Sequence, residues 1–244
     1  MLTDTWTVMS KEWKEMFATG GGGERGRWSF LIFLGVFGLF LPLQFGVQGV
    51  ETGQSVIFFA WVPVLLVTSV IVDSFAGERE RHTLETLLAT RLPDNAILFG
   101  KMLAAVAYAL LLTVGSLILG TAAVNLVYRP GRFVTYPPLL LGGAVVVALF
   151  GALLAASLGV LVSLRAPSAR QAQQTLGLAM ILLFVPFYVI PFLPESLRAS
   201  AASAFMTIPV GLIAAAGLAL LLVLNAITVR AAMARFQRSR LILD

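Results

Sequence analysis

The residues of this chain best suited to chemistry are the charged side chains between Asp73 and Lys101. Segment 73–101 carries five acids and four bases, although only 12% of the whole chain is charged. These residues are Asp73, Glu78, Arg79, Glu80, Arg81, Glu85, Arg91, Asp94 and Lys101. Charges of both signs at this density can orient a partner surface. The simpler alternative is a solvated connection whose charges only keep it in water.

Common catalytic and nucleotide-binding motifs are absent from the sequence. It contains no G-x-S-x-G, no H-E-x-x-H and no G-x-x-x-x-G-K-[ST]. With no cysteine and the single histidine His82, thiolate nucleophiles and multi-histidine metal sites are excluded. We therefore expect no catalytic, cofactor-binding or metal-binding residues, and no enzymatic activity of the chain itself.

The elements around segment 73–101 are strongly apolar. Hydrophobic residues make up 59% of the chain and the mean hydropathy is +0.92, values typical of an integral membrane protein. Six stretches lack Asp, Glu, Lys and Arg over at least the ~17 residues that a helix needs to cross a bilayer. They are 28–46, 55–72, 102–128, 138–164, 173–193 and 205–229. The sequence predicts an all-α membrane protein with six transmembrane helices.

The basic residues predict the orientation of these helices. Six spans place both termini on one side, and 14 of the 17 lysines and arginines fall on that side. The other side carries only Arg129, Arg132 and Arg198. The positive-inside rule then predicts cytoplasmic termini, a cytoplasmic segment 73–101 and a multi-pass protein of the inner (cytoplasmic) membrane. These flanks also explain the pI near 10.1, so nucleic acid is not expected as a partner.

The N-terminal segment 1–27 is predicted to lead into the first span as an amphipathic helix. Its apolar face comprises Trp6, Met9, Trp13, Met16 and Phe17. Its opposite face comprises Lys11, Glu12, Lys14 and Glu15. Such a helix lies in the membrane interface, where its role is either simple anchoring or mechanical coupling to segment 73–101.

Within segment 73–101, a short helix is predicted over 83–90. Thr83 can cap its start, Leu84, Leu87 and Leu88 share one side, and Glu85 lies on the other. Pro93 breaks this helix and Asp94 can cap the next span. An external loop is expected at 194–204, and four prolines between 186 and 209 also fit broken, re-entrant helices there. No internal repeat is visible, so 1–244 is expected to form one domain.

Segment 73–101 resembles the first cytoplasmic loop of the ATP-binding-cassette exporter permeases of the second type (ABC-2), nearest to their bacterial sodium and drug exporter branch. The shared pattern is an acid-x-acid pair, Thr-x-Glu, a Leu-Leu pair and a closing Gly-Lys. In this chain these are Glu78 and Glu80, Thr83 and Glu85, Leu87 and Leu88, and Gly100 and Lys101. The lead SKEWKEMF, with Lys11 and Glu12, is also similar. Many members have Gly in place of His82 and Pro in place of Arg91.

The resemblance implies a permease subunit that forms the substrate pathway and docks on separate ATPase subunits. The implied docking residues are Glu78, Glu80, Thr83, Leu84, Glu85, Leu87 and Leu88, with the three leucines entering a groove on the ATPase. It also implies two ATPase copies, which hold ATP and Mg, and a second permease, identical or homologous. Membrane lipid is the remaining partner.

Two other function classes stay open on the sequence alone. A membrane anchor or assembly subunit would explain the spans but leave the pattern in segment 73–101 accidental. An intramembrane enzyme is disfavoured because the spans lack ionisable residues. The same lack of charge favours an amphipathic or lipid-like substrate over a small ion, although backbone carbonyls also coordinate ions.

Overall fold

The computed structural model describes residues 1–17, 23–189, 194–197 and 209–237 of the chain. Every regular element in these residues is a helix, so the prediction of an all-α protein is confirmed. Most of the expected external loop 194–204 lies outside the described residues; within it, residues 195–197 are helical.

From α1 to α9 the helices follow one another along the described chain, most of them through short connections. The first half of the chain contains α1 (Leu2–Phe17), α2 (Gly23–Phe33), the π-helix η1 (Leu34–Phe40), α3 (Leu41–Glu51), α4 (Gln54–Val72), the π-helix η2 (Asp73–Gly77), α5 (Glu78–Glu80) and α6 (Thr83–Leu88). The second half contains α7 (Asp94–Tyr128), α8 (Pro138–Ser163), α9 (Ala169–Val189) and α11 (Val210–Arg235).

Within the described residues, four helices are long and apolar enough to cross a membrane. They cover Arg27–Glu51, Asp94–Tyr128, Pro138–Ser163 and Gly211–Arg235. These four correspond to the first, third, fourth and sixth predicted spans. The predicted spans 55–72 and 173–193 fall on α4 and α9, and their crossing of the membrane remains a prediction. The third helix begins eight residues before its apolar stretch, because segment 94–101 is already helical.

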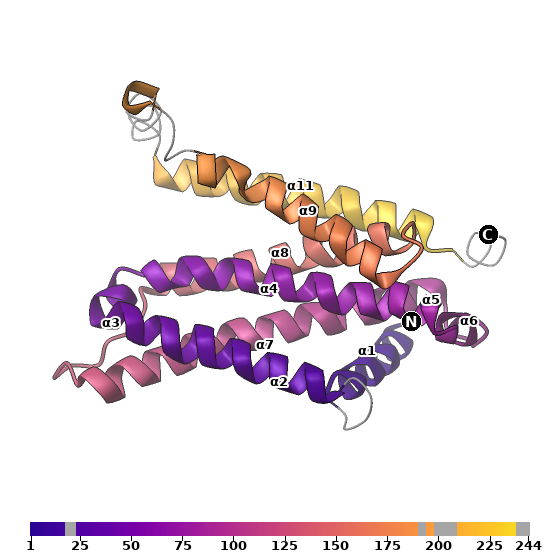
Figure 1. The fold of residues 1–244 in the computed structure, drawn as a ribbon, viewed down its shortest axis with the longest axis horizontal. Coiled ribbons are helices and arrows are strands. Elements are labelled where there is room, and N and C mark those ends of the chain that lie inside the picture. Colours follow the sequence, from indigo (N-terminus) through magenta and orange to yellow (C-terminus); the bar gives the residue numbers. More distant parts are fainter. Residues whose placement is uncertain (18–22, 190–193, 198–208, 238–244) are drawn as a thin grey trace.

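The core lies where α4, α7 and α8 meet (Figure 1). Small residues of α7 and α8, including Ala105, Ala109, Ala152 and Ala156, are fully buried there. Alanine lets helices approach closely, which provides dispersion contacts where apolar burial alone gives little driving force in lipid.

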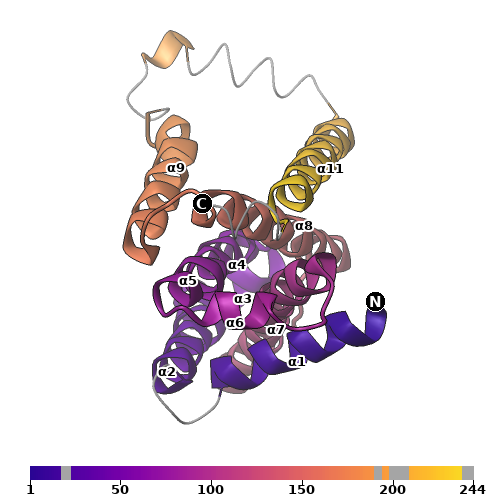
Figure 2. The same cartoon turned by 90° about the vertical axis from the view of Figure 1, so that its right-hand side faces the viewer.

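Helices α9 and α11 diverge from one another on the outer side of α8 (Figure 2). Hydrogen bonds attach α11 to α8: Asn225 Nδ2 donates to the carbonyl of Phe150 at 3.0 Å, and Ser157 Oγ donates to Thr228 Oγ1 at 2.7 Å. These polar groups were visible in the sequence only as scattered residues in apolar spans. In the structure they join one helix to its neighbour.

The connection between α7 and α8 is fixed by one asparagine. Asn125 Nδ2 donates to the carbonyl of Val134 at 2.6 Å, and the Val134 amide donates back to Asn125 Oδ1 at 2.8 Å. Tyr136, two residues further on, is fully buried. This end of the bundle is therefore closed by an ordered segment that lies against α7.

The opposite end, which we call the loop end, carries α1, α5 and α6 and the first turns of α7 and α9 (Figure 1). Helix α1 runs across the bundle there, so that the other helices are seen almost end on beside it (Figure 2). It approaches α7 at Gly100, where an added Cβ would lie 2.6 Å from Val8 Cβ. Glycine is required at this position by the closeness of the two helices.

Candidate functional site

Segment 73–101 begins as a direct continuation of helix α4. Helix α4 continues into η2, and α5 follows directly. At Gly77 an added Cβ would lie 2.6 Å from Asp73 Oδ1, so the Asp73 side chain would have to move to admit a larger residue there. The chain then turns at His82, whose φ of 55° is left-handed, and α6 starts at Thr83. Glycine would adopt this left-handed conformation without the steric cost that a histidine Cβ brings.

Lys101 is the centre of a buried polar cluster at the loop end. Its side chain is 0% exposed, and Nζ lies 2.7 Å from Glu12 Oε1 and 2.8 Å from Glu78 Oε1. The same ammonium donates to the carbonyl and to the hydroxyl of Ser74, each at 3.0 Å. The ring of Phe75 lies 5.6 Å from Nζ and adds a cation–π contact.

The cluster is completed by Lys11, the residue before Glu12. Lys11 Nζ lies 3.1 Å from Glu78 Oε1 and 3.3 Å from Glu12 Oε1. Ser74 Oγ donates to the other carboxylate oxygen, Glu12 Oε2, at 2.8 Å. Two ammonium groups thus face two buried carboxylates, contributed by α1, α5 and α7. We call these four side chains, with Ser74, the charge cluster.

The charge cluster shifts the acid–base behaviour of α1. Burial disfavours the ionised carboxyl of Glu12, but the charges of Lys101 and Lys11 outweigh burial and hold the pKa of Glu12 below its ordinary value of 4.5. Burial likewise acts to lower the pKa of Lys11, but the carboxylates of Glu12 and Glu78 outweigh it and raise that pKa above 10.5. Each residue is therefore held in its charged form by the others.

Glu12, Glu15 and Glu78 also bring three carboxylates within 4.8 Å of one another. Lys11 Nζ pairs with all three, at 3.3, 3.1 and 3.1 Å respectively. The lysine ammonium thus takes the position that a metal ion would need. The geometry describes an ion-pair cluster and gives no support for a metal site.

The structure changes the interpretation of the leucines on α6. Leu84 is only 4% exposed and belongs to the core with Phe75 and Ile97, and Leu87 packs partly against that core. The expectation that Leu84 enters a groove on a partner is therefore wrong for this conformation, because its side chain anchors α6 to its own bundle. The Leu88 side chain lies outside the described residues. Helix α6 ends at Leu88, two residues before the predicted end.

Polar residues occupy the outer side of this segment. The exposed ones are Glu80, Arg81, His82, Thr83, Glu85, Thr86, Thr90 and Arg91. Thr83 does not cap α6 as predicted; its hydroxyl donates to the carbonyl of Glu78 at 3.2 Å and ties α6 to α5. We call these eight exposed residues the α5–α6 surface.

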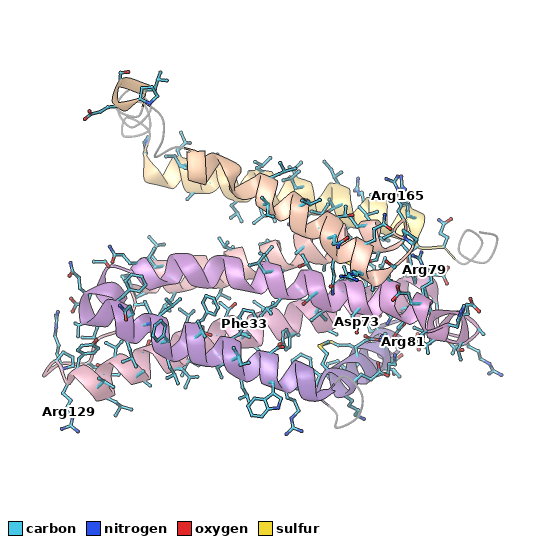
Figure 3. The ribbon with its side chains drawn as sticks, viewed as in Figure 1. Phe33, Asp73, Arg79, Arg81, Arg129 and Arg165 are labelled. Carbon is cyan, nitrogen blue, oxygen red and sulfur yellow. The ribbon has the colours of Figure 1, made fainter. Side chains whose placement is uncertain are left out.

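Helix α5 also holds the connection between α8 and α9. The guanidinium of Arg79 donates to the carbonyls of Leu164, at 3.3 Å, and Ala166. The neighbouring Glu80 Oε1 accepts the amide of Ala169, the first residue of α9, at 3.1 Å. Figure 3 labels Arg79 and Arg165 at the loop end of the bundle. Segment 73–101 is therefore attached to the α8–α9 connection at three points.

The predicted interfacial residues of α1 divide into two groups. Trp6 is 66% exposed, and Met9 lies beside it in a shallow hollow against Ala107. Trp13 and Phe17 pack inward in an aromatic group, with the Phe17 ring 6.0 Å from that of Tyr108. Only the first half of the apolar face is thus available to a membrane surface.

Sequence reasoning placed Glu12 on the polar, outward face of α1, and this placement is wrong. The side chain is buried because Lys101 and Ser74 lie under it and satisfy both carboxylate oxygens. Ser74 was not singled out at all. The available signal was a lysine and a glutamate paired at positions 11 and 12 together with a lone lysine at the start of an apolar span, since such a lysine needs a nearby carboxylate.

These features together define a helical multi-pass membrane protein with a buried charge cluster at one end. Residues 41–231 match the family model of the ABC-2 family transporter proteins. The match covers more than half of the chain, and the chain belongs to this family.

A characterised relative is similar over part of the chain. It is the ABC transporter permease protein NatB of Bacillus subtilis (strain 168), which is 27% identical over 155 residues. The match covers 57% of this chain and 39% of NatB. The chain therefore aligns with well under half of the length of this relative.

Proposed function

We propose that this chain is the permease subunit of an ATP-driven exporter and that it couples to a separate ATPase through the α5–α6 surface. Family membership and the absence of any phosphate-binding motif support this assignment, since energy must then come from another chain. The observation that carries the proposal is the charge cluster. It connects the segment that would receive the partner to α1 and to the start of α7.

The contacts suggest how force would pass through the subunit. A partner bound on the α5–α6 surface pulls on Glu78, which is held through Oε1 while its buried Oε2 has no hydrogen-bond partner among the described residues. Displacement of Glu78 acts on Lys101, and therefore on α7. Through Arg79 the same displacement acts on the carbonyls at the end of α8. One docking event thus moves two helices of the core.

The remaining architecture follows the family pattern. We propose six spans, with α4 and α9 as the second and fifth, and both termini and segment 73–101 in the cytoplasm of the inner membrane, as the basic residues favour. A second permease subunit, identical or homologous, and two ATPase subunits complete the transporter. ATP and Mg bind the ATPase. The transported substrate is not specified by any of these features.

Co-purification with the cognate ATPase tests the proposal. The tagged chain, expressed in its source cells and extracted in mild detergent, is expected to recover an ATPase with the sequence motifs of an ABC subunit. Glu85→Arg on the α5–α6 surface is expected to reduce the recovered ATPase at least tenfold. The matched control Glu195→Arg makes the same charge change on an exposed residue outside the loop end. Equal recovery with Glu85→Arg and wild type would contradict docking at this surface.

The buried face of α6 gives a second, contrasting variant. Leu84→Asp places a carboxylate in the core, so it is expected to lower the stability of the chain as well as ATPase recovery. If no ABC-type ATPase is recovered even with the wild-type chain, the result favours the alternative function, a non-transporting membrane anchor or assembly subunit.

A further inference from the structure

A pocket of about 430 Å³ opens between α8, α9 and α11 at the loop end, away from the charge cluster. Its polar lining consists of two guanidinium groups, one amide and one hydroxyl. The lining residues are Arg165, Arg235, Gln171, Thr175, Leu161, Val162, Ala166 and Ala231. No acidic residue lines the pocket.

The two arginines of this pocket are free to meet a ligand. Elsewhere at the loop end, Arg81 pairs with Asp73 at 3.5 Å, and Arg79 donates to two carbonyls. In the part of the chain that the structure describes, neither Arg165 nor Arg235 forms an ion pair, and both side chains are exposed at the pocket. Two cations on one pocket without an acid attract an anion. Guanidinium groups suit phosphate in particular, because they donate parallel hydrogen bonds to two of its oxygens.

The remaining walls of the pocket are apolar. Leu161, Val162 and Ala231 form its walls. Further along the two diverging helices, large apolar side chains are exposed, among them Ile181 and Leu182 on α9 and Leu224 and Ile227 on α11. A soluble anion would leave these walls in contact with water. A ligand that carries a phosphate next to hydrocarbon satisfies both halves of the site.

We propose that this pocket binds the phosphate group of an anionic phospholipid, with Arg165 and Arg235 as the phosphate ligands and the lipid chains between α9 and α11. The site requires only that α8, α9 and α11 lie in the membrane, so it does not depend on ATPase docking. Arg79 holds the carbonyl of Ala166 at the rim of the pocket. Lipid binding is therefore expected to stabilise the α8–α9 connection on which α5 rests.

Lipid binding to the purified full-length chain tests this assignment. The chain is titrated with phosphatidylglycerol or phosphatidylcholine in mild detergent, and bound lipid is counted by native mass spectrometry. Phosphatidylglycerol is expected to bind more tightly. Arg165→Gln and Arg235→Gln are each expected to weaken its binding by about tenfold, the effect of losing one hydrogen-bonded charge. Arg230→Gln, an exposed arginine of α11 outside the pocket, is the matched control and should change binding by less than about twofold.

Three results would overturn the proposal. Equal weakening by Arg230→Gln would mean that surface charge alone attracts the lipid. Equal affinity for soluble glycerol 3-phosphate and for phosphatidylglycerol would mean that the apolar walls contribute nothing. Unchanged binding in both pocket variants would place the lipid elsewhere. Arg165→Lys and Arg235→Lys keep the charge but lose the paired hydrogen bonds, so partial retention of binding with a monodisperse elution profile separates loss of the site from misfolding.

Discussion

Lys101 Nζ lies 2.7 Å from Glu12 Oε1, across 89 residues of sequence. The lysine begins the apolar part of α7, and the glutamate belongs to a helix that crosses the end of the bundle. Their side chains are 0% and 7% exposed. A pair so thoroughly removed from water fixes the position of α1 on α7, because separation would take the shortest ion pair from two buried charges and leave Glu12 with only the part-exposed Lys11 as its cation.

Replacing Lys101 should therefore lower the free energy of unfolding far more than replacing an exposed lysine. Lys101→Met leaves the buried carboxylates of Glu12 and Glu78 with Lys11 as their one remaining ammonium partner, and the free energy of unfolding should fall by up to about 3–5 kcal/mol. Denaturant titration in mixed micelles measures this change. Lys14→Met, an exposed lysine of α1, serves as the control and should be nearly neutral. Similar losses in the two variants would show that the charge cluster does not stabilise the fold.

The charge cluster also predicts a dependence of stability on pH. The pKa of Glu12 is lowered in the folded chain, so its contribution is fully present above its ordinary value of 4.5 and is lost as the pH falls through the folded-state pKa. The melting temperature of the wild type should thus fall below pH 4.5 more steeply than that of Glu12→Gln. Parallel curves for the two proteins would exclude Glu12 as the titrating group.

The contribution of Lys11 to stability depends on pH in the opposite direction. Its pKa is raised above the ordinary 10.5, so its contribution is present below that pH and is lost only as the pH rises through the folded-state pKa. Between pH 4.5 and 10.5 the contributions of Glu12 and Lys11 to stability should therefore be almost constant.

Close packing at Gly100 gives a prediction that does not involve charge. Gly100→Ala places a Cβ 2.6 Å from Val8 Cβ and 3.0 Å from the carbonyl oxygen of Thr5, so α1 must move away from α7. A loss of about 1–3 kcal/mol is expected. Hydrogen exchange of the α1 amides should accelerate at the same time. The control Gly142→Ala, which meets no atom within 4 Å, should be neutral or slightly stabilising. Unchanged exchange in α1 would contradict the tight contact.

The turn before α6 carries local strain at His82. A non-glycine residue in the left-handed conformation costs about 1–2 kcal/mol. Glycine avoids this cost but loses more backbone entropy on folding, so His82→Gly should stabilise the turn by up to about 1 kcal/mol. His82→Val should destabilise it. Hydrogen exchange over residues 78–90 measures both. Arg129→Gly relieves the same strain at the far end of α7 and should leave exchange in 78–90 unchanged. Slower hydrogen exchange over residues 78–90 in the valine variant than in wild type would be incompatible with the left-handed conformation.

The sequence predicted the helical class and the approximate extent of four membrane helices, because long uncharged stretches have few other solutions. It also predicted the helices of α1 and α6. It could not predict which of their faces turn inward. On α1 the periodicity favoured the aromatic side as the buried one, yet the buried residues are Val8 and Glu12. Val8 packs against Gly100, which has no side chain, and Glu12 lies over the ammonium of Lys101.

The leucines of α6 show the same limit. Amphipathic periodicity identifies a face that avoids water but not the surface that covers it. Leu84 is covered by Phe75 and Ile97 of its own chain, and no local pattern distinguishes this from cover by a partner. The long-range contacts that decide the question, from Arg79 to Ala166 and from Lys101 to Glu12, join residues more than 80 positions apart.

Helix α7 is held at both of its ends. Lys101 fixes it to α1 and α5, and Asn125 fixes its last turns to Val134 in the following connection. At about 1.5 Å per residue, its 35 residues span about 52 Å, more than the thickness of a bilayer core. A rod fastened in this way has no slack at either end. A small tilt imposed on the side of the charge cluster would be carried along the helix as movement of the segment around Val134, at its other end.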